Sequence, residues 1–373
     1  MIEIDGSMGE GGGAVLRVAT ALSAVSRRPV RIYNIRVKRD NPGLQHQHLS
    51  GVEALASLSG AKVRGAELGS TELTFEPGRI RGGKHRVDIG TAGSTTLVLQ
   101  VLMIASAFAE RSVEVEIRGG TDNPRAPPVD YVKNVMLPII GRMGYRVEVS
   151  CLRRGHYPRG GGVITAKMEP VRMLRALKMT ERGRVVRISG LSHSVRLPDD
   201  VSRRIAHAAG IALLKAGYSN VSIRSESHPQ FDDVHLGPGA GITLWAETER
   251  GGLLGANALG APGKPSEKVG REAADELVSA LGTGCAIDRY MADQLVPYMA
   301  IAEGTSEVTC SELTRHTLTN IRLVETVIGV KFDVEGKIGV SGRIRVTGAG
   351  LTNDPENSKP KEYQQNYEGD MNR

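Results

Sequence analysis

The sequence predicts an α/β (α+β) protein in which three βαβαββ repeats pack together, with a small α/β domain inserted between the second and third. Segments 4–25 and 87–108 share a short strand, a loop of small residues and an apolar helix of similar length. Each segment then leads into a strand and an Asp-Asn-Pro loop, at 40–42 and at 122–124. Chance similarity would explain one matching apolar helix, but it explains poorly a shared order of strands, helices and loops.

A third copy of this pattern occupies residues 285–346, where an apolar helix precedes a strand, a second helix and a strand pair. The stretch before it has a different order of strand, helix, strand, hairpin and helix, which indicates a separate inserted domain. The C-terminal residues are polar, proline-interrupted and poor in large aliphatic side chains, as is typical of disorder. We therefore expect repeats one and two over 1–183, the inserted domain over 184–278, the third repeat over 279–350 and a disordered tail over 351–373.

The composition favours a protein that binds anions. The 373 residues carry a formal net charge of +7 with a pI near 9.3, which makes nucleic acid or a nucleotide the first partner to consider. Only 4% of residues are aromatic, which argues against rows of stacking aromatics. Three cysteines without paired spacing argue against a disulfide framework or a structural zinc site. The chain shows neither a secretory leader nor a long apolar span, so we expect a cytoplasmic protein without a membrane partner.

The first loop of repeat one has the composition of a phosphate-binding loop. Residues 9–13 read GEGGG before a helix, and such glycines let backbone amides approach a phosphate. Alone the loop is weak evidence, because a flexible turn would look the same and no Walker or dinucleotide motif is present. Glu10 within the loop and Arg17 in the helix strengthen the case, since a carboxylate can hold a divalent metal there and an arginine can pair with phosphate.

The stretch NPGLQHQHL (41–49) places polar side chains at the start of the next helix. The Asn-Pro-Gly turn fixes the backbone, and apolar residues follow at helical spacing. A helix N-terminus favours anions, and Arg36 and Arg39 lie just upstream. A solvated basic loop is the plainer interpretation of this segment taken by itself.

Three further stretches could belong to the same site. GTAGSTTLVLQ (90–100) ends a second loop-to-helix junction at Gln100, and DRYMADQ (288–294) places Tyr290 and Asp293 one helical turn apart. His316 in TRHTLTN would usually be structural or solvated, but it occupies the repeat-three slot that QHQHL fills in repeat one. RGHYPRGGG (154–162) is either a hairpin tip or a loop whose glycines let the backbone approach something closely.

Taken together, these stretches closely resemble the RNA 3′-terminal phosphate cyclase family. The resemblance runs from Met1 to about Val346, and the combination is far more specific than any one motif. It implies three repeats of a fold shared with the enolpyruvyl transferases plus an inserted α/β domain, in agreement with the repeats found above. The motifs are IDGSMGEGGGAVLR, NPGLQHQHLSGVEAL, GTAGSTTLVLQ, GGTDNPRAPPVDY, RGHYPRGGG, MADQLVPYMA and HTLTN.

The resemblance also implies an activity and a set of site residues. In the family, a histidine attacks ATP to give histidine–AMP, the AMP passes to an RNA 3′-phosphate, and the 2′-hydroxyl then closes a 2′,3′-cyclic phosphate. By position the histidine is His316, and Glu10 would bind a divalent metal, Mg²⁺ or Mn²⁺. Phosphates and the RNA end would be bound by Arg36, Arg39, Gln47 and His48. The ATP site would be formed by Arg17, Gln100, Pro127, Tyr290, Met291, Ala292, Asp293 and Gln294.

Two other functions stay open at this point. A catalytically dead cyclase-like protein would act as a binding module in ribosome assembly, but such relatives lack the histidine found at 316. An enolpyruvyl-transferase-like metabolic enzyme should carry six repeats, whereas three are found. The expected partners are ATP and RNA with a 3′-phosphate end, and the sequence leaves a homodimer open.

Overall fold

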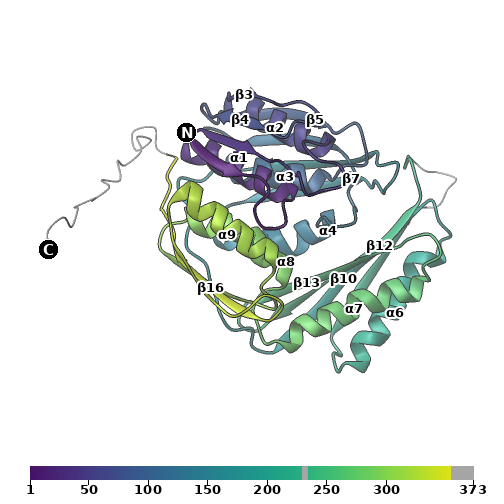
Figure 1. The fold of residues 1–373 in the computed structure, drawn as a ribbon. Coiled ribbons are helices and arrows are strands. Elements are labelled where there is room, and N and C mark those ends of the chain that lie inside the picture. Colours follow the sequence, from purple (N-terminus) through teal and green to yellow (C-terminus); the bar gives the residue numbers. More distant parts are fainter. Residues whose placement is uncertain (229–233, 354–373) are drawn as a thin grey trace.

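The computed structural model describes residues 1–228 and 234–353 (Figure 1). Repeat one forms a four-stranded sheet in the order β1-β2-β4-β3, in which β1 and β2 are parallel and the other pairs are antiparallel. Apolar residues recur at helical spacing in both of its helices, so each helix buries one face. The elements are β1 (Ile2–Asp5), α1 (Gly13–Ser26), β2 (Val30–Tyr33), α2 (His46–Ser59), β3 (Lys62–Arg64) and β4 (Leu73–Glu76).

Repeat two has the same strand order, β5-β6-β8-β7, with the same parallel first pair. Its second helix is irregular, because Pro138 lacks a backbone N–H and displaces the preceding turn, which widens into a π-helical turn. The elements are β5 (Gly83–Asp88), α3 (Thr95–Ser106), β6 (Val113–Gly119), α4 (Val129–Tyr131), η1 (Val132–Met136), α5 (Leu137–Arg142), β7 (Val147–Arg153) and β8 (Gly162–Met168).

The third sheet repeats the order again as β9-β14-β16-β15. Its first strand precedes the inserted domain, so the third unit draws on chain outside the 279–350 that we expected. A strand of two residues carries no periodic pattern, which is why the sequence did not reveal it. The elements are β9 (Lys178–Met179), α8 (Arg289–Ile301), β14 (Thr305–Cys310), α9 (Arg315–Ile328), β15 (Phe332–Glu335) and β16 (Gly342–Thr347).

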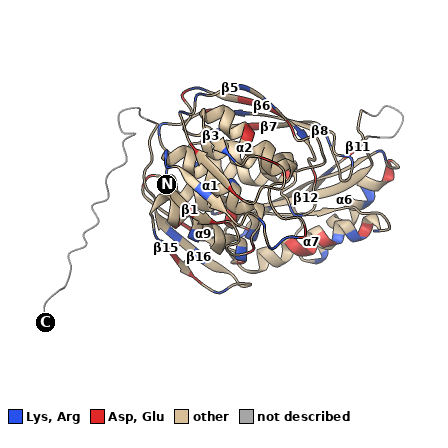
Figure 2. Ribbon diagram, turned by 45° about the horizontal axis from the view of Figure 1, so that its top comes forward, with Lys and Arg blue, Asp and Glu red and all other residues tan. Residues whose placement is uncertain are grey.

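The stretch between β9 and α8 forms its own sheet, β11-β10-β12-β13, with α6 and α7 packed on one side (Figure 1). Its apolar residues make a hydrophobic cluster separate from the one that the three repeats share. The outer faces of α6 and α7 carry charges of both signs (Figure 2). The elements are β10 (Val185–Val195), α6 (Asp200–Lys215), β11 (Val221–His228), β12 (Gly239–Thr248), β13 (Leu253–Leu259) and α7 (Ser266–Gly282).

The helices of the three repeats pack against one another, which confirms the predicted fold class. Helix α1 contacts α2, α3 and α9, and α8 packs against α9. Residues 351–353 belong to this folded body rather than to a disordered tail, because the Leu351 N–H donates to the carbonyl of Ile301 and the Asn353 N–H to that of Arg172. The rest of the predicted tail, 354–373, lies outside the described residues. Within the described part of the chain, no helix combines the length and the apolar character that crossing a membrane requires.

Candidate functional site

The GEGGG loop and the start of α9 bring Glu10 and His316 into contact. Thr314 caps α9 by accepting a hydrogen bond from the Thr317 N–H at 3.1 Å, which places His316 in the first turn. Gly9 adopts φ +55° directly against Thr319, where any larger residue would collide. Glu10 Oε2 therefore lies 2.8 Å from His316 Nε2, with 33% and 46% of the two side chains exposed. Both predicted residues can be reached from solvent.

Arg39 reaches the same loop from the segment after β2. Its Nη2 donates to the backbone oxygen of Glu10 at 3.0 Å and lies 3.9 Å from the Glu10 carboxylate. Gly12 leaves the space that this guanidinium occupies. The plainer interpretation of the basic segment as a solvated loop is therefore incomplete, because Arg39 contacts the loop that carries the candidate metal ligand.

His48 lies at the N-terminus of α2 with its ring against α1. Its Nδ1 accepts a hydrogen bond from the Gln45 N–H at 3.1 Å. Burial, and then the charges of Arg17 and Arg36, lower the pKa of His48 to about 3, so the ring is neutral at pH 7. A neutral ring that accepts at Nδ1 carries its proton on Nε2, and this nitrogen lies against Gly13 at the start of α1. His48 thus offers an uncharged N–H donor beside a helix N-terminus.

A chain of hydrogen-bonded polar side chains links helices α1, α3 and α8. Arg17 Nε donates to Gln100 Oε1 at 3.2 Å, and Gln100 Nε2 donates to Gln294 Oε1 at 2.6 Å. Gln294 Nε2 in turn donates to Asp293 Oδ1 at 3.0 Å. Burial raises the pKa of Asp293 to about 7. The structure therefore joins four of the predicted ATP-site residues, from α1, α3 and α8, in one network.

Gln47 and Pro127 are joined through the start of α3. Gln47 Oε1 accepts a hydrogen bond from the Ser94 N–H at 2.9 Å, which ties repeat one to repeat two. Thr96, the second residue of α3, donates to the carbonyl of Pro127 at 2.7 Å. These contacts fix the first turn of α2, which carries Gln47, and the loop that carries Pro127.

Three predicted residues contact the protein in ways that sequence reasoning did not anticipate. The Arg36 Nη1 donates to the carbonyls of Asn41 and Gly43 at 2.6 and 2.8 Å, so it holds the Asn-Pro-Gly turn. Met291 and Ala292 have side chains buried in the core. Both side chains are buried because the apolar face of α8 packs against α9 and β14.

Tyr290 lies at the junction with the inserted domain. Its hydroxyl donates to Glu276 Oε1 of α7 at 2.8 Å and accepts from Arg289 at 2.9 Å. Its ring meets that of Tyr131 edge-on, with centroids 6.2 Å apart. Tyr290 therefore contacts residues other than those of the polar network around Gln100.

The RGHYPRGGG stretch connects the antiparallel strands β7 and β8, as the hairpin alternative predicts. Gly160 and Gly161 adopt φ of +64° and +73°. Gly160 lies against the backbone of Ala92, so a side chain there would collide with the loop before α3. The close approach that three glycines suggested is made, at this position, to the protein itself.

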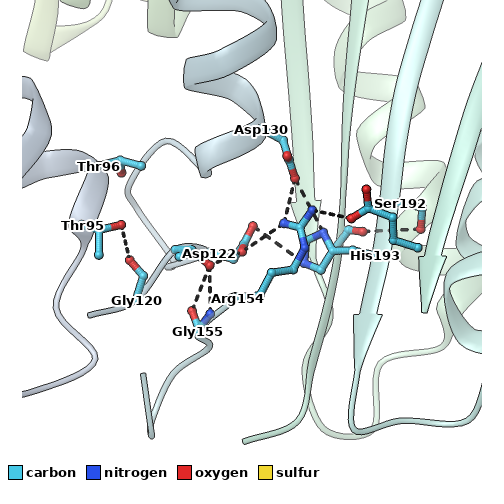
Figure 3. Close-up of polar contacts among 12 residues, drawn as sticks. Thr95, Thr96, Gly120, Asp122, Asp130, Arg154, Gly155, Ser192 and His193 are labelled. Carbon is cyan, nitrogen blue, oxygen red and sulfur yellow. Dashed lines mark hydrogen bonds and ion pairs between the residues drawn. The ribbon is translucent and has the colours of Figure 1, made fainter. Parts of the chain in front are cut away.

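A second polar cluster, which sequence reasoning missed, lies where repeat two meets the inserted domain (Figure 3). Arg154 Nη1 donates to Asp130 Oδ2 at 2.9 Å and lies 3.5 Å from Asp122 Oδ2, while its Nη2 donates to Glu226 Oε2 at 3.0 Å. His193 Nε2 lies 3.7 Å from Asp122 Oδ1, and burial lowers the pKa of His193 well below its usual value. The available signal was the Asp-Asn-Pro loop of repeat two, whose aspartate begins this cluster.

Comparison with known proteins identifies close relatives. The family model described as "RNA 3′-terminal phosphate cyclase" matches residues 8–334. Proteins of that name from Methanopyrus kandleri and Ignicoccus hospitalis are 49% and 51% identical, covering 93% and 92% of this chain and 98% and 96% of theirs. The Thermococcus kodakarensis protein is 50% identical over 92% of this chain and 98% of its own. Among solved structures, the enolpyruvyl transferase NikO from Streptomyces tendae aligns with 94% of this chain and 49% of its own, with a TM-score of 0.37 and 11% identity.

Proposed function

Because the chain belongs to the RNA 3′-terminal phosphate cyclase family, we propose that it converts an RNA 3′-phosphate to a 2′,3′-cyclic phosphate using ATP, through a covalent histidine–AMP. The observation that supports this mechanism best is the 2.8 Å contact between His316 Nε2 and Glu10 Oε2. It brings a nucleophile and a carboxylate together from the two ends of the chain, at helix N-termini that favour phosphate.

In the first step, His316 Nε2 attacks the α-phosphorus of ATP. A P–N bond forms, the bond from this phosphorus to the bridging oxygen breaks, and pyrophosphate leaves. Glu10 accepts the Nε2 proton through the 2.8 Å contact as the P–N bond forms, which frees the Nε2 lone pair to bond to phosphorus. Its half-exposed carboxylate is also the kind of oxygen ligand that Mg²⁺ and Mn²⁺ prefer, and a single carboxylate suffices for an ion that keeps waters and phosphates as its other ligands. Such an ion, when bound, would neutralise charge on the leaving pyrophosphate.

The phosphates are held by donors around the start of α1. The His48 Nε2–H and the backbone amides of the GEGGG loop lie together there. His48 is suited to this role because it stays neutral and keeps its proton, so its hydrogen bond does not depend on pH near neutrality. Arg17 adds a positive charge one turn further along the helix.

The adenosine would be framed by the network of Arg17, Gln100, Gln294 and Asp293. Pro127 and Tyr290, which make their contacts outside this network, would complete the site. After adenylylation, an oxygen of the RNA 3′-phosphate attacks the AMP phosphorus, and the P–N bond to His316 breaks. The neighbouring 2′-hydroxyl then attacks the activated 3′-phosphorus, loses its proton, and AMP leaves. Arg36 and Arg39 lie just upstream of the NPGLQHQHL segment and would bind the terminal phosphate.

The two other functions are less well supported. Glu10 and His316 are both present and in contact, whereas a dead binding module has no use for this pair. An enolpyruvyl transferase should contain six repeats, and the described residues contain three sheets with the repeat topology.

The decisive experiment is to incubate the protein with α-labelled ATP and divalent metal, denature it, and measure retained label. The proposal predicts acid-labile label on wild type and none on His316→Ala. An unlabelled wild-type protein that nevertheless binds RNA would support the binding-module alternative instead.

A further inference from the structure

We propose that the protein holds a transition-metal ion, Zn²⁺ in the first instance, between Asp122, His156 and His193. This second cation site would lie where the loops after β6 and β7 meet β10 of the inserted domain (Figure 3). It is separate from Glu10 and does not depend on the proposed function.

The three side chains have the spacing of a metal site that can close on an ion. One ligand atom from each lies within 4.8 Å of the others, and Asp122 Oδ1 is 3.7 Å from His193 Nε2. Bonds of about 2.0–2.2 Å in a tetrahedral zinc site separate neighbouring ligands by roughly 3.4 Å, so side-chain movements of about 1 Å would complete this one. All three residues are buried, with 1%, 6% and 2% exposed for Asp122, His156 and His193.

Several buried polar atoms of these three residues have no hydrogen-bond partner. Among the described residues, Asp122 Oδ1, His156 Nε2 and both ring nitrogens of His193 have no hydrogen-bond partner. The other oxygen of Asp122, in contrast, accepts from the Thr121 hydroxyl at 2.7 Å. A buried polar atom without a partner is destabilising, so native proteins rarely keep several together. One ion would satisfy a ligand atom on each of the three residues.

The charge of the cluster favours a cation. The single guanidinium of Arg154 lies within 3.5 Å of carboxylate oxygens from Asp122, Asp130 and Glu226. Asp122 and Asp130 are the buried carboxylates, whereas 45% of the Glu226 side chain is exposed, so one buried negative charge is left to be offset. A divalent ion offsets this charge, and two imidazole ligands select Zn²⁺ over Mg²⁺ or Ca²⁺.

Asp130 is placed to become the outer partner that metal-binding histidines usually have. With His193 Nε2 facing Asp122, its Nδ1 lies 3.9 Å from Asp130 Oδ2, which is slightly beyond hydrogen-bond distance and would shorten as the side chains close on the ion. A carboxylate in this position fixes the tautomer of the imidazole and increases its basicity toward the metal. Asp130 is itself held by Arg154, which keeps its carboxylate beside His193.

Two glycines of β12 make room for the imidazoles. A side chain at Gly239 would run into the ring of His156, and one at Gly241 would meet His193 Cε1. Gly241 is also the residue that pairs with His193 across the sheet. The Gly-Ala-Gly sequence of this strand therefore keeps the two rings close to Asp122.

The ion would tie repeat two to the inserted domain. His193 belongs to β10, whereas Asp122 and His156 lie in loops of repeat two. Asp122 and His156 also line a cavity of about 530 Å³ that continues along Tyr157, Val201 and Leu259. Solvent can therefore approach the ion from this side and supply the fourth ligand.

The test uses the full-length protein, stripped with a chelator and dialysed against Zn²⁺ or Co²⁺. We expect one equivalent of metal to be retained per chain, and the Co²⁺ form to show the intense visible bands of tetrahedral coordination. The His156→Ala/His193→Ala variant should bind the metal at least about 100-fold more weakly. His207→Ala is the matched control, because this histidine is exposed on α6 of the inserted domain and should leave affinity unchanged.

Two further variants decide where the metal binds. Glu10→Gln and His316→Ala should leave Zn²⁺ affinity unchanged, and a loss there would assign the metal to the other site and overturn the proposal. If circular dichroism shows that the His156→Ala/His193→Ala variant is unfolded, Asp122→Asn replaces it, since an amide keeps the size and can still accept from Thr121.

Failure of the wild-type protein to retain metal would also overturn the proposal. Unchanged metal affinity in the folded ligand variant would do the same. Protein adenylylation by ATP is measured separately, so failure of this inference leaves the proposed function intact.

Discussion

Two clusters in this molecule each combine a carboxylate, an arginine and a histidine, and they differ mainly in burial. In the cluster of Glu10, Arg39 and His316, about a third to a half of each side chain is exposed. In the cluster of Asp122, Arg154 and His193, at most 6% of any of these side chains is exposed. The first lies at the ends of helices, and the second is enclosed between a repeat and the inserted domain.

The difference in burial changes what the same groups can do. An exposed ion pair contributes about 0–1 kcal/mol to the free energy of unfolding. Glu10 can therefore leave Arg39 to bind a metal, and Arg39 can leave Glu10 to bind a phosphate, with little loss of stability. A buried charge cannot lose its partner so easily, because it would remain uncompensated in a low-dielectric environment. The exposed cluster is therefore suited to binding and releasing substrates, and the buried cluster to holding parts of the fold together.

The sharpest test of the exposed cluster is His316→Ala. Alanine cannot form a phosphoramidate, so we expect adenylylation to fall by on the order of 10³-fold or more, with the melting temperature nearly unchanged. Label retained from α-labelled ATP on denatured protein measures the first effect, and His207→Ala is the control. If the variant still became labelled, another residue would be the nucleophile.

In the buried cluster, Arg154→Met should mainly lower the stability of the protein, in contrast to His316→Ala, which should mainly lower activity. Methionine removes the charge that Asp122 and Asp130 share, and we expect a loss of about 3–5 kcal/mol in the free energy of unfolding. Denaturant titration of wild type and variant measures it. A change below about 1 kcal/mol would show that burial does not distinguish the two clusters as we argue.

Glu10→Gln tests whether the exposed carboxylate binds metal. The amide keeps the size of the side chain but loses its charge. We therefore expect the metal concentration needed for half-maximal adenylylation to rise roughly 10–100-fold. Removal of an outer partner of a metal ligand already lowers metal affinity by this much. A titration with Mg²⁺ and Mn²⁺ measures this shift. An unchanged titration would restrict Glu10 to its contact with His316.

The smallest effect is expected for the paired change Arg36→Ala and Arg39→Ala. Loss of charge-assisted hydrogen bonds to phosphate should lower RNA cyclisation about tenfold more than histidine–AMP formation. RNA affinity should also fall less steeply with salt, because fewer counterions are released. Parallel assays of the two reactions decide this, with Arg86→Ala on β5 as control, since 83% of that side chain is exposed. Equal loss in both reactions would assign the arginines to the ATP triphosphate.

The repeats could be predicted from the sequence because their loops recur in order. The Asp-Asn-Pro loops and the helices after small-residue loops mark repeats one and two, and the observed sheets share one strand order. Strand β9 escaped this reasoning, because Lys178 and Met179 are too few to show an alternating pattern. The tail boundary was placed too early, because Leu351 and Asn353 are held by backbone hydrogen bonds that composition cannot reveal.

The two clusters were not equally predictable. Glu10 and His316 each lie in a motif with local character, a glycine-rich loop and a capped helix start, and the repeat pattern suggested that such loops meet. Asp122, Arg154 and His193 come from three separate segments, and each looks like an ordinary loop or strand residue. Their proximity follows from the way the inserted domain packs on repeat two, which is a tertiary property.

Strand β9 also sets the order in which the molecule can assemble during translation. Met179 pairs with Val308 of β14, so the third sheet cannot close until the ribosome has synthesised the entire inserted domain and α8. The first two repeats and the inserted domain, which has its own hydrophobic cluster, have all their residues available earlier and can fold as units. Because His316 follows β14, it is synthesised late, and the contact between Glu10 and His316 can form only after most of the chain has been made. We therefore expect a nascent chain, or one truncated before α9, neither to consume ATP nor to modify RNA ends.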